Sequence, residues 1–137
     1  MPMAQKQHFE VNTNDRQQLI DITAQVERIV AQSGFRDGLA VVFTPHTTAG
    51  ITINENADPD VQHDLLLVLD RLLPQLPEFR HAEGNSPGHA KSSLVGCSQT
   101  LIVEHGRLCL GTWQGIYFCE FDGPRTRRVW VRLIQDA

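Results

Sequence analysis

Histidine, carboxylate, lysine and hydroxyl side chains are dense between residues 81 and 93 of the chain. The segment contains His81, Glu83, His89, Lys91, Ser92 and Ser93. Imidazole together with carboxylate is the ligand chemistry of zinc and similar ions, whereas an ammonium group beside hydroxyls can hold a phosphate. A polar loop without chemistry is the alternative interpretation. The segment therefore indicates a candidate site for a metal ion or a phosphate.

The same segment is not a nucleotide-binding P-loop. Gly84 and Gly88 enclose three residues where that motif has four, and two residues separate Gly88 from Lys91. The motif places its lysine directly after the second glycine, where backbone N–H groups and the ammonium surround the phosphates. The spacing excludes nucleotide hydrolysis by such a loop.

A second candidate segment is residues 44–50, between two predicted strands. Loops at strand ends often present reactive groups on a rigid scaffold. His46 in this loop could bind a metal or move a proton near neutral pH. The competing interpretation is a histidine whose ring only hydrogen-bonds the turn.

A third segment runs from Asn54 to Asp64 and enters a predicted helix. Asp58-Pro59 is a helix start, with a capping side chain and a proline at the first helical position. Acidic residues in a first turn are favoured by the helix dipole, which accounts for Asp60 without any function. Glu55 is not explained by capping, so it is the stronger candidate for chemistry.

The fourth segment, residues 111–125, combines aromatic and charged residues. Trp113 could stack on an aromatic ligand or simply pack. Glu120 lies among apolar residues of a predicted strand, where a carboxylate is costly unless it is paired or functional. Arg125 could hold a phosphate with two parallel hydrogen bonds.

Apolar spacing predicts the elements that must position these residues. Phe9 and Val11 indicate a first strand, and Leu19 to Val30 follow helical spacing up to a C-terminal Gly34. Further strands are expected at 39–43, 51–53, 101–103, 108–110, 116–121 and 129–134, with a second helix from Asp58 to Pro74 and a hairpin turn at His105-Gly106. Residues 74–91 read as a long polar loop. Two helices with many antiparallel strands predict an α+β fold, mainly an antiparallel β-sandwich-like sheet covered by the helices.

Length and composition bound the possible functions. The 137 residues suit one domain, 1–137, and the net charge of -4 disfavours a nucleic-acid binder. No apolar run approaches the roughly 20 residues that cross a bilayer, and residues 1–6 show no hydrophobic signal segment. We therefore expect a cytoplasmic protein without a membrane partner. The odd cysteine count predicts free thiols, most of them buried.

The ordered combination of these segments resembles the YjbQ family, also called uncharacterised protein family 0047. The resemblance rests on His46-Thr47-Thr48-Ala49, Asn54-Glu55-Asn56, Glu83-Gly84, His89 to Leu94, Gly111 to Ile116 and Glu120 to Arg125 with Arg127. It covers nearly the whole chain. It implies the α+β sandwich-like fold, a homotrimer, and a polar site near subunit contacts.

The resemblance also implies a weak, secondary thiamine-phosphate synthase activity. Such a transferase joins a pyrimidine diphosphate to a thiazole phosphate and expels pyrophosphate. We expect Glu55, Asp60, Glu83 and Glu120 as catalytic residues, Lys91, Ser92, Trp113 and Arg125 as substrate-binding residues, and His46, His81 and His89 as ligands of zinc, manganese or magnesium. Two alternatives stay open: a non-catalytic protein that binds a metal or a small phosphorylated metabolite, and a metal-dependent hydrolase of such a metabolite.

Overall fold

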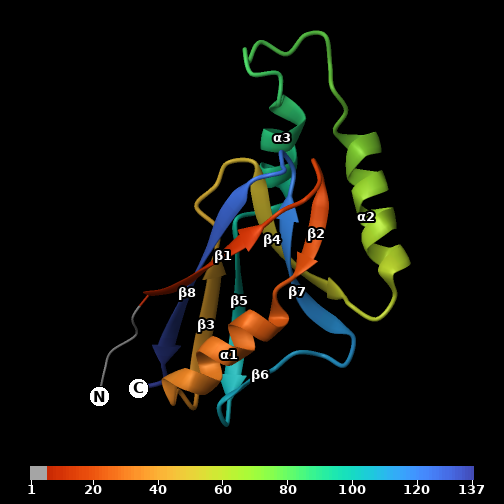
Figure 1. The fold of residues 1–137 in the computed structure, drawn as a ribbon. Helices are drawn as coiled ribbons and strands as arrows, with labels where there is room; N and C mark the ends of the chain where they lie inside the picture. Colours follow the sequence, from red (N-terminus) through yellow and green to blue (C-terminus); the bar gives the residue numbers. More distant parts are fainter. Residues whose placement is uncertain (1–5) are drawn as a thin grey trace.

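Two antiparallel sheets and three helices make up the structure, a computed structural model that describes residues 6–137 (Figure 1). The five-stranded sheet has the order β1-β8-β3-β5-β6, and the three-stranded sheet has the order β2-β7-β4. The strands are β1 (Lys6–Asn12), β2 (Gln18–Asp21), β3 (Gly38–Phe43), β4 (Ala49–Glu55), β5 (Ser98–Glu104), β6 (Arg107–Leu108), β7 (Gln114–Glu120) and β8 (Thr126–Gln135). The helices are α1 (Thr23–Ser33), α2 (Pro59–Leu72) and α3 (Ser86–Val95). The expected α+β fold with antiparallel strands is confirmed.

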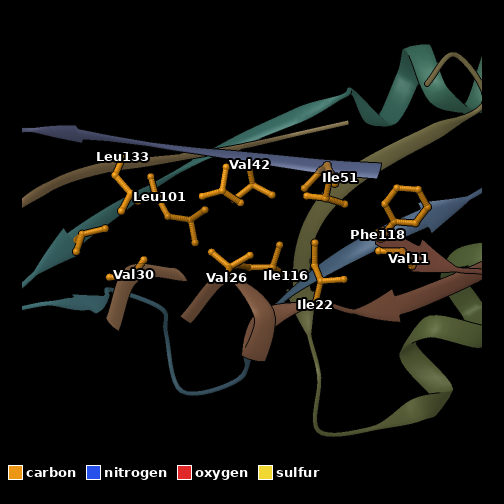
Figure 2. Packing of buried hydrophobic residues seen from close by; sticks show 14 of the residues in the cluster. Val11, Ile22, Val26, Val30, Val42, Ile51, Leu101, Ile116, Phe118 and Leu133 are labelled. Atoms are coloured by element: carbon orange, nitrogen blue, oxygen red, sulfur yellow. The ribbon is translucent and has the colours of Figure 1, made fainter. Parts of the chain in front are cut away.

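The apolar core lies between the two sheets and α1 (Figure 2). Val26 and Val30 of α1 are fully buried and face Val42 of the five-stranded sheet and Ile116 of the three-stranded sheet. Apolar side chains at every second strand position reach this core, as expected for strands buried on one face. The core thus holds the ends of the strands, and the loops between them, in fixed positions.

The first helix begins later than its apolar spacing predicts. Leu19 lies on β2 and pairs with Cys119 of β7, so its assignment to the helix was wrong. The carboxylate of Asp21 accepts hydrogen bonds from the N–H (2.9 Å) and the hydroxyl (2.6 Å) of Thr23. This local turn separates β2 from α1, although apolar residues on both sides of the turn pack against the same core. Gly34 ends the helix with a left-handed φ of 72°, as predicted.

The last third of the predicted loop 74–91, residues 86–91, is the start of helix α3. That expectation was therefore wrong, and the described chain has three helices rather than two. The sequence of α3 has no apolar stripe, and tertiary contacts stabilise it instead. A Cβ at Gly88 would lie 2.9 Å from the carbonyl oxygen of Phe121, so only glycine allows this approach. Residues 73–85 form the remaining connection, which arches from α2 to α3 (Figure 1).

Helix α2 lies outside the core and none of its side chains is buried. The side chain of Asp58 accepts from the N–H of Asp60 and Pro59 is the first helical residue, as predicted. The ammonium of Lys91 hydrogen-bonds Asp70 of α2, and the side chain of Gln62 donates to Glu55 O (2.8 Å) and Tyr117 Oη (2.6 Å). Polar contacts therefore attach this helix to β4 and β7 at its N-terminal end and to α3 at its C-terminal end.

Candidate functional site

A cavity of about 310 Å³, here called the His46 pocket, lies where three loop segments meet at one end of the sheets. Residues 44–48 connect β3 to β4, residues 73–85 lead into α3, and residues 121–125 connect β7 to β8. The lining side chains are Pro45, His46, Thr47, Thr48, His81, Glu83, Asn85, His89, Asp122, Arg125 and Arg127.

Sheet topology brings two of these loops together. Strands β3 and β8 belong to the five-stranded sheet, whereas β4 and β7 belong to the other, so both connections cross between the sheets. Ala49 at the start of β4 pairs with Glu120 at the end of β7, which places the crossings at the same end. The Thr44 hydroxyl donates to Arg128 O (3.0 Å) and joins them directly.

The ring of His46 is held as a neutral hydrogen-bond donor. Its Nε2 accepts the backbone N–H of Arg128 at 2.9 Å. A neutral imidazole accepts through one nitrogen and carries its proton on the other, so Nδ1 bears the hydrogen. Burial, with the nearby Arg127 guanidinium, lowers the pKa of His46 below its ordinary value. His46 can therefore donate Nδ1–H to a ligand, while Nε2 is not free to ligate a metal.

Glu120 forms a buried ion pair with Arg127 beside the pocket. Its carboxylate also accepts the Thr13 hydroxyl (2.8 Å) and the Asp122 N–H (2.9 Å). Burial by itself raises the pKa of Glu120, but the hydrogen bonds from Arg127, Asp122 and Thr13 outweigh it and lower the pKa overall. The expected catalytic Glu120 is thus an ionised, fully hydrogen-bonded partner of Arg127 and does not line the cavity.

Arg125 is the more accessible cation of the pocket. Its guanidinium donates to Asp122 Oδ2 at 3.1 Å, and the side chain is 51% exposed. The Asn85 amide donates to the same oxygen at 2.8 Å. Because a single carboxylate contact leaves most of the five guanidinium donors unused, Arg125 can also contact an anion in the cavity.

His81, His89 and Glu83 come together on the side of the pocket nearest α3. The two imidazole rings meet edge to face with centroids 5.2 Å apart, and Nε2 of His81 is 3.7 Å from Glu83 Oε1. Within residues 6–137, no three His, Cys, Asp or Glu side chains are grouped as a metal site. The described arrangement therefore does not fit zinc, manganese or magnesium as it stands, and the expected metal stays a prediction.

Lys91 and Ser92, two of the expected substrate-binding residues, do not line the His46 pocket. Lys91 is 2% exposed and its ammonium is bonded to Asp70 and to Gln17. The Ser92 hydroxyl donates to Ala49 O at 2.6 Å and so attaches α3 to β4. Both side chains have structural partners in the described chain.

Glu55, Asp60 and Trp113 lie near the opposite end of β4. Six residue-to-residue steps along the strand lead from Ala49 to Glu55, about 20 Å at the usual rise. Trp113 is 63% exposed and its carbonyl oxygen accepts the N–H of Asn56 (2.9 Å), while Asp60 is exposed in the first turn of α2. These residues form a separate polar group and do not line the pocket that contains His46.

Sequence reasoning did not assign roles to Thr48, Asn85, Asp122 or Arg127, which all line the pocket. The run Arg125-Thr126-Arg127-Arg128, with three arginines in four residues, was the available sequence signal for Arg127. The alternation of apolar and polar residues along β8 could not show that the guanidinium of Arg127 is buried and donates to Thr48 Oγ1 at 2.9 Å.

The cysteines are free, as expected, but only Cys119 is buried. Burial raises the pKa of its thiol to about 12. Cys97 and Cys109 are exposed on the sheet ends, which corrects the expectation that most are buried.

Among the helices within residues 6–137, none is long and apolar enough to cross a membrane.

Comparison with known proteins places this architecture in one family. The family described as "UPF0047 protein YjbQ-like" matches residues 7–136. The chain is 55% identical to a UPF0047 protein of Methanocaldococcus jannaschii over 93% of both chains, and 56% identical to UPF0047 protein YugU of Bacillus subtilis over 92% of this chain and 96% of that one.

Solved structures show the same fold. A YjbQ/UPF0047 family protein of Clostridium acetobutylicum has a TM-score of 0.90 and 57% identity, over 93% of this chain and 98% of that one. A protein of unknown function from Sulfolobus solfataricus has a TM-score of 0.92 at 31% identity, over 97% and 98% of the two chains. The chain therefore belongs to the YjbQ family, UPF0047.

Proposed function

We propose that the His46 pocket binds the phosphate of a small phosphorylated metabolite, and that the protein acts there as a weak thiamine-phosphate synthase-like transferase. The observation that carries the binding step is the neutral ring of His46. Its Nδ1–H and the guanidinium of the neighbouring Arg125 can each donate a hydrogen bond but cannot accept one. Phosphate offers only acceptors, so donors of this kind are its complement.

Charge and position around the pocket support the same ligand. Arg125 lines it with a side chain that is 51% exposed, whereas the charge of Arg127 is balanced by Glu120. The N-terminus of α3 begins at Ser86 beside it. Partial positive charge at a helix N-terminus adds to the attraction for an anion. The cavity volume of about 310 Å³ is at the lower end of the range for small-ligand sites.

The transferase chemistry follows from what an anion site can stabilise. In the reaction that the resemblance implies, the thiazole nitrogen forms a bond to the pyrimidine methylene carbon while the carbon–oxygen bond to diphosphate breaks. The nucleophile has a lone pair and loses no proton, so the main requirement is to stabilise the pyrophosphate that leaves. Arg125 and the donor of His46 are the residues for that role, with Glu83 as the remaining catalytic candidate in the pocket.

Two alternatives use the same pocket. A binding protein would retain phosphate ligands without turnover. A metal-dependent hydrolase would need a bound ion beside the attacking water, with Glu83 or His89 as the base. The homotrimer implied by the family resemblance is part of the proposal, and the exposed apolar side chains of α2 (Leu67, Val68 and Leu72) favour it.

Calorimetric titration with inorganic phosphate and pyrophosphate tests the binding step, and a turnover assay with the two thiamine precursors tests the transfer. We expect His46→Ala and Arg125→Met each to weaken phosphate binding about tenfold or more, since a hydrogen bond to a charged group contributes about 1.5–3 kcal/mol. Arg28→Met, on the exposed side of α1, is the matched control. Unchanged affinity in both pocket variants would refute the site, and binding without turnover would select the non-catalytic alternative.

A further inference from the structure

A second cavity of about 410 Å³, here called the Leu73 pocket, adjoins the His46 pocket. Glu83, Asn85 and Asp122 line both cavities. The remaining walls of the Leu73 pocket come from the C-terminal end of α2 and the residues after it, the first two turns of α3, Phe121 after β7, and Arg16 between β1 and β2. The two cavities are therefore neighbours across one shared wall.

The Leu73 pocket has a different chemical character from its neighbour. Leu73, Pro74, Pro87 and Phe121 supply apolar wall. The charged lining has two cations, Arg16 and Lys91, and three carboxylates, Asp70, Glu83 and Asp122, and Lys91 is paired with Asp70. Paired charges attract an ionic ligand weakly, while apolar wall favours the flat, uncharged part of a molecule. The pocket thus suits a ring compound better than a second phosphate.

The wall between the two cavities includes the side chains of Asn85 and Asp122, which are hydrogen-bonded to each other. The Asn85 amide donates to Asp122 Oδ2 at 2.8 Å, which fixes the orientation of the amide because Asp122 can only accept. Asn85 Oδ1 is then the single buried side-chain polar atom within residues 6–137 that has no hydrogen-bond partner. A buried acceptor without a partner is costly, so a ligand N–H or O–H at this wall would be favourable.

We propose that the substrate occupies both cavities, with its phosphate in the His46 pocket and a compact, uncharged ring bearing an N–H or O–H donor in the Leu73 pocket. The inference rests on the proposed phosphate site and adds the place where the organic part of the substrate binds. It predicts that affinity for a phosphate ester depends on the size of the Leu73 pocket, whereas affinity for inorganic phosphate does not.

The test compares inorganic phosphate with 4-aminophenyl phosphate, which adds a ring and an amino donor. Calorimetry on the full chain measures both ligands for wild type, Leu73→Trp and Gln75→Trp. Both substitutions enlarge side chains that line the Leu73 pocket and not the His46 pocket. Gln75 is exposed, so Gln75→Trp keeps the test valid if Leu73→Trp unfolds the protein. Leu76→Trp, an exposed neighbour outside the lining, is the matched control.

We expect wild type and Leu76→Trp to bind the ester at least about tenfold more tightly than inorganic phosphate. The two pocket variants should lose that preference and keep their affinity for inorganic phosphate. An ester bound no more tightly than phosphate by wild type, or a preference that survives in both folded pocket variants, overturns the two-cavity substrate. Absence of any phosphate binding to wild type would instead overturn the proposed function on which it rests.

Discussion

The guanidinium of Arg127 and the carboxylate of Glu120 form an ion pair in which both side chains are essentially inaccessible, at 2% and 0% exposure. Nε of Arg127 donates to Oε1 at 2.8 Å, and its NH2 group reaches Oε2 and the hydroxyl of Thr48. The pair therefore joins the end of β7 to the loop that carries His46, and it neutralises a cation beside the pocket.

Glu120→Gln should reduce the free energy of unfolding by about 3–5 kcal/mol, because it leaves the buried Arg127 charge without its partner. Urea denaturation measures the change, and Glu78→Gln at an exposed position is the control. A loss below about 1 kcal/mol would mean that solvent reaches the pair and that Glu120 is free for another role.

Acid should destabilise the protein through His46. Its pKa is lowered in the folded chain, mainly by burial, so the unfolded chain binds more protons as the pH falls below the ordinary value of 6.5. The stabilisation is complete above that pH and is lost as the pH decreases further, since an imidazolium cannot accept the Arg128 N–H.

The comparison for this pH effect is His46→Gln, whose amide oxygen accepts at any pH. Melting temperatures from pH 7.5 to 5 should fall more for wild type and for the exposed-site control His63→Gln than for His46→Gln. Equal slopes in all three proteins would contradict the assigned protonation of His46.

Phosphate binding should survive metal removal. His46 Nε2 is occupied and no described group of three ligands surrounds His81 and His89, so the donors act on the anion directly. After EDTA treatment and buffer exchange, phosphate affinity should stay within about twofold, with elemental analysis of the same samples. Loss of binding that zinc, manganese or magnesium restores, and that His81→Ala or His89→Ala abolishes, would establish the metal site expected from the sequence instead.

The pair between Lys91 and Asp70 should govern how firmly α2 is attached. Burial by itself raises the pKa of Asp70, but hydrogen bonds from Lys91 and Gln17 lower it overall. Asp70→Asn leaves the buried ammonium without a carboxylate, at a cost of roughly 1–3 kcal/mol. Hydrogen exchange should accelerate in 59–72 and not in β3, while the exposed Asp64→Asn should leave both unchanged. Faster exchange throughout the chain would contradict a local attachment.

The homotrimer predicts a solution mass near three times the 15.4 kDa of one chain. Light scattering at micromolar concentration measures it. Val68→Asp places a charge among the exposed apolar side chains of α2 and should shift the mass toward one chain, whereas Gln32→Glu on α1 should not. A stable wild-type monomer would contradict the trimer.

The sequence by itself determined the elements with strong local signals. Asp58-Pro59, Gly34 and the His105-Gly106 turn are readable because capping, left-handed backbone and tight hairpins each demand particular residues. Apolar patterning likewise identified most of the strands and the antiparallel α+β class, but it missed β2 and placed the strand of 107–108 at 108–110. Local patterning failed at Leu19 and at α3, because strand pairing and the close approach at Gly88 are contacts with distant segments.

Only the tertiary structure decided which candidate residues share a site. His46 and His89 are far apart along the chain and line one pocket, whereas Glu55, close to His46 in sequence, lies along the strand at the other end of the sheet. Likewise Lys91 reads as a phosphate ligand from its neighbours in sequence but is paired with Asp70. Spacing along a chain determines on which side of one helix or strand a side chain lies. The pairing order of the strands in the two sheets determines which strand ends meet in space, and therefore which side chains share a site.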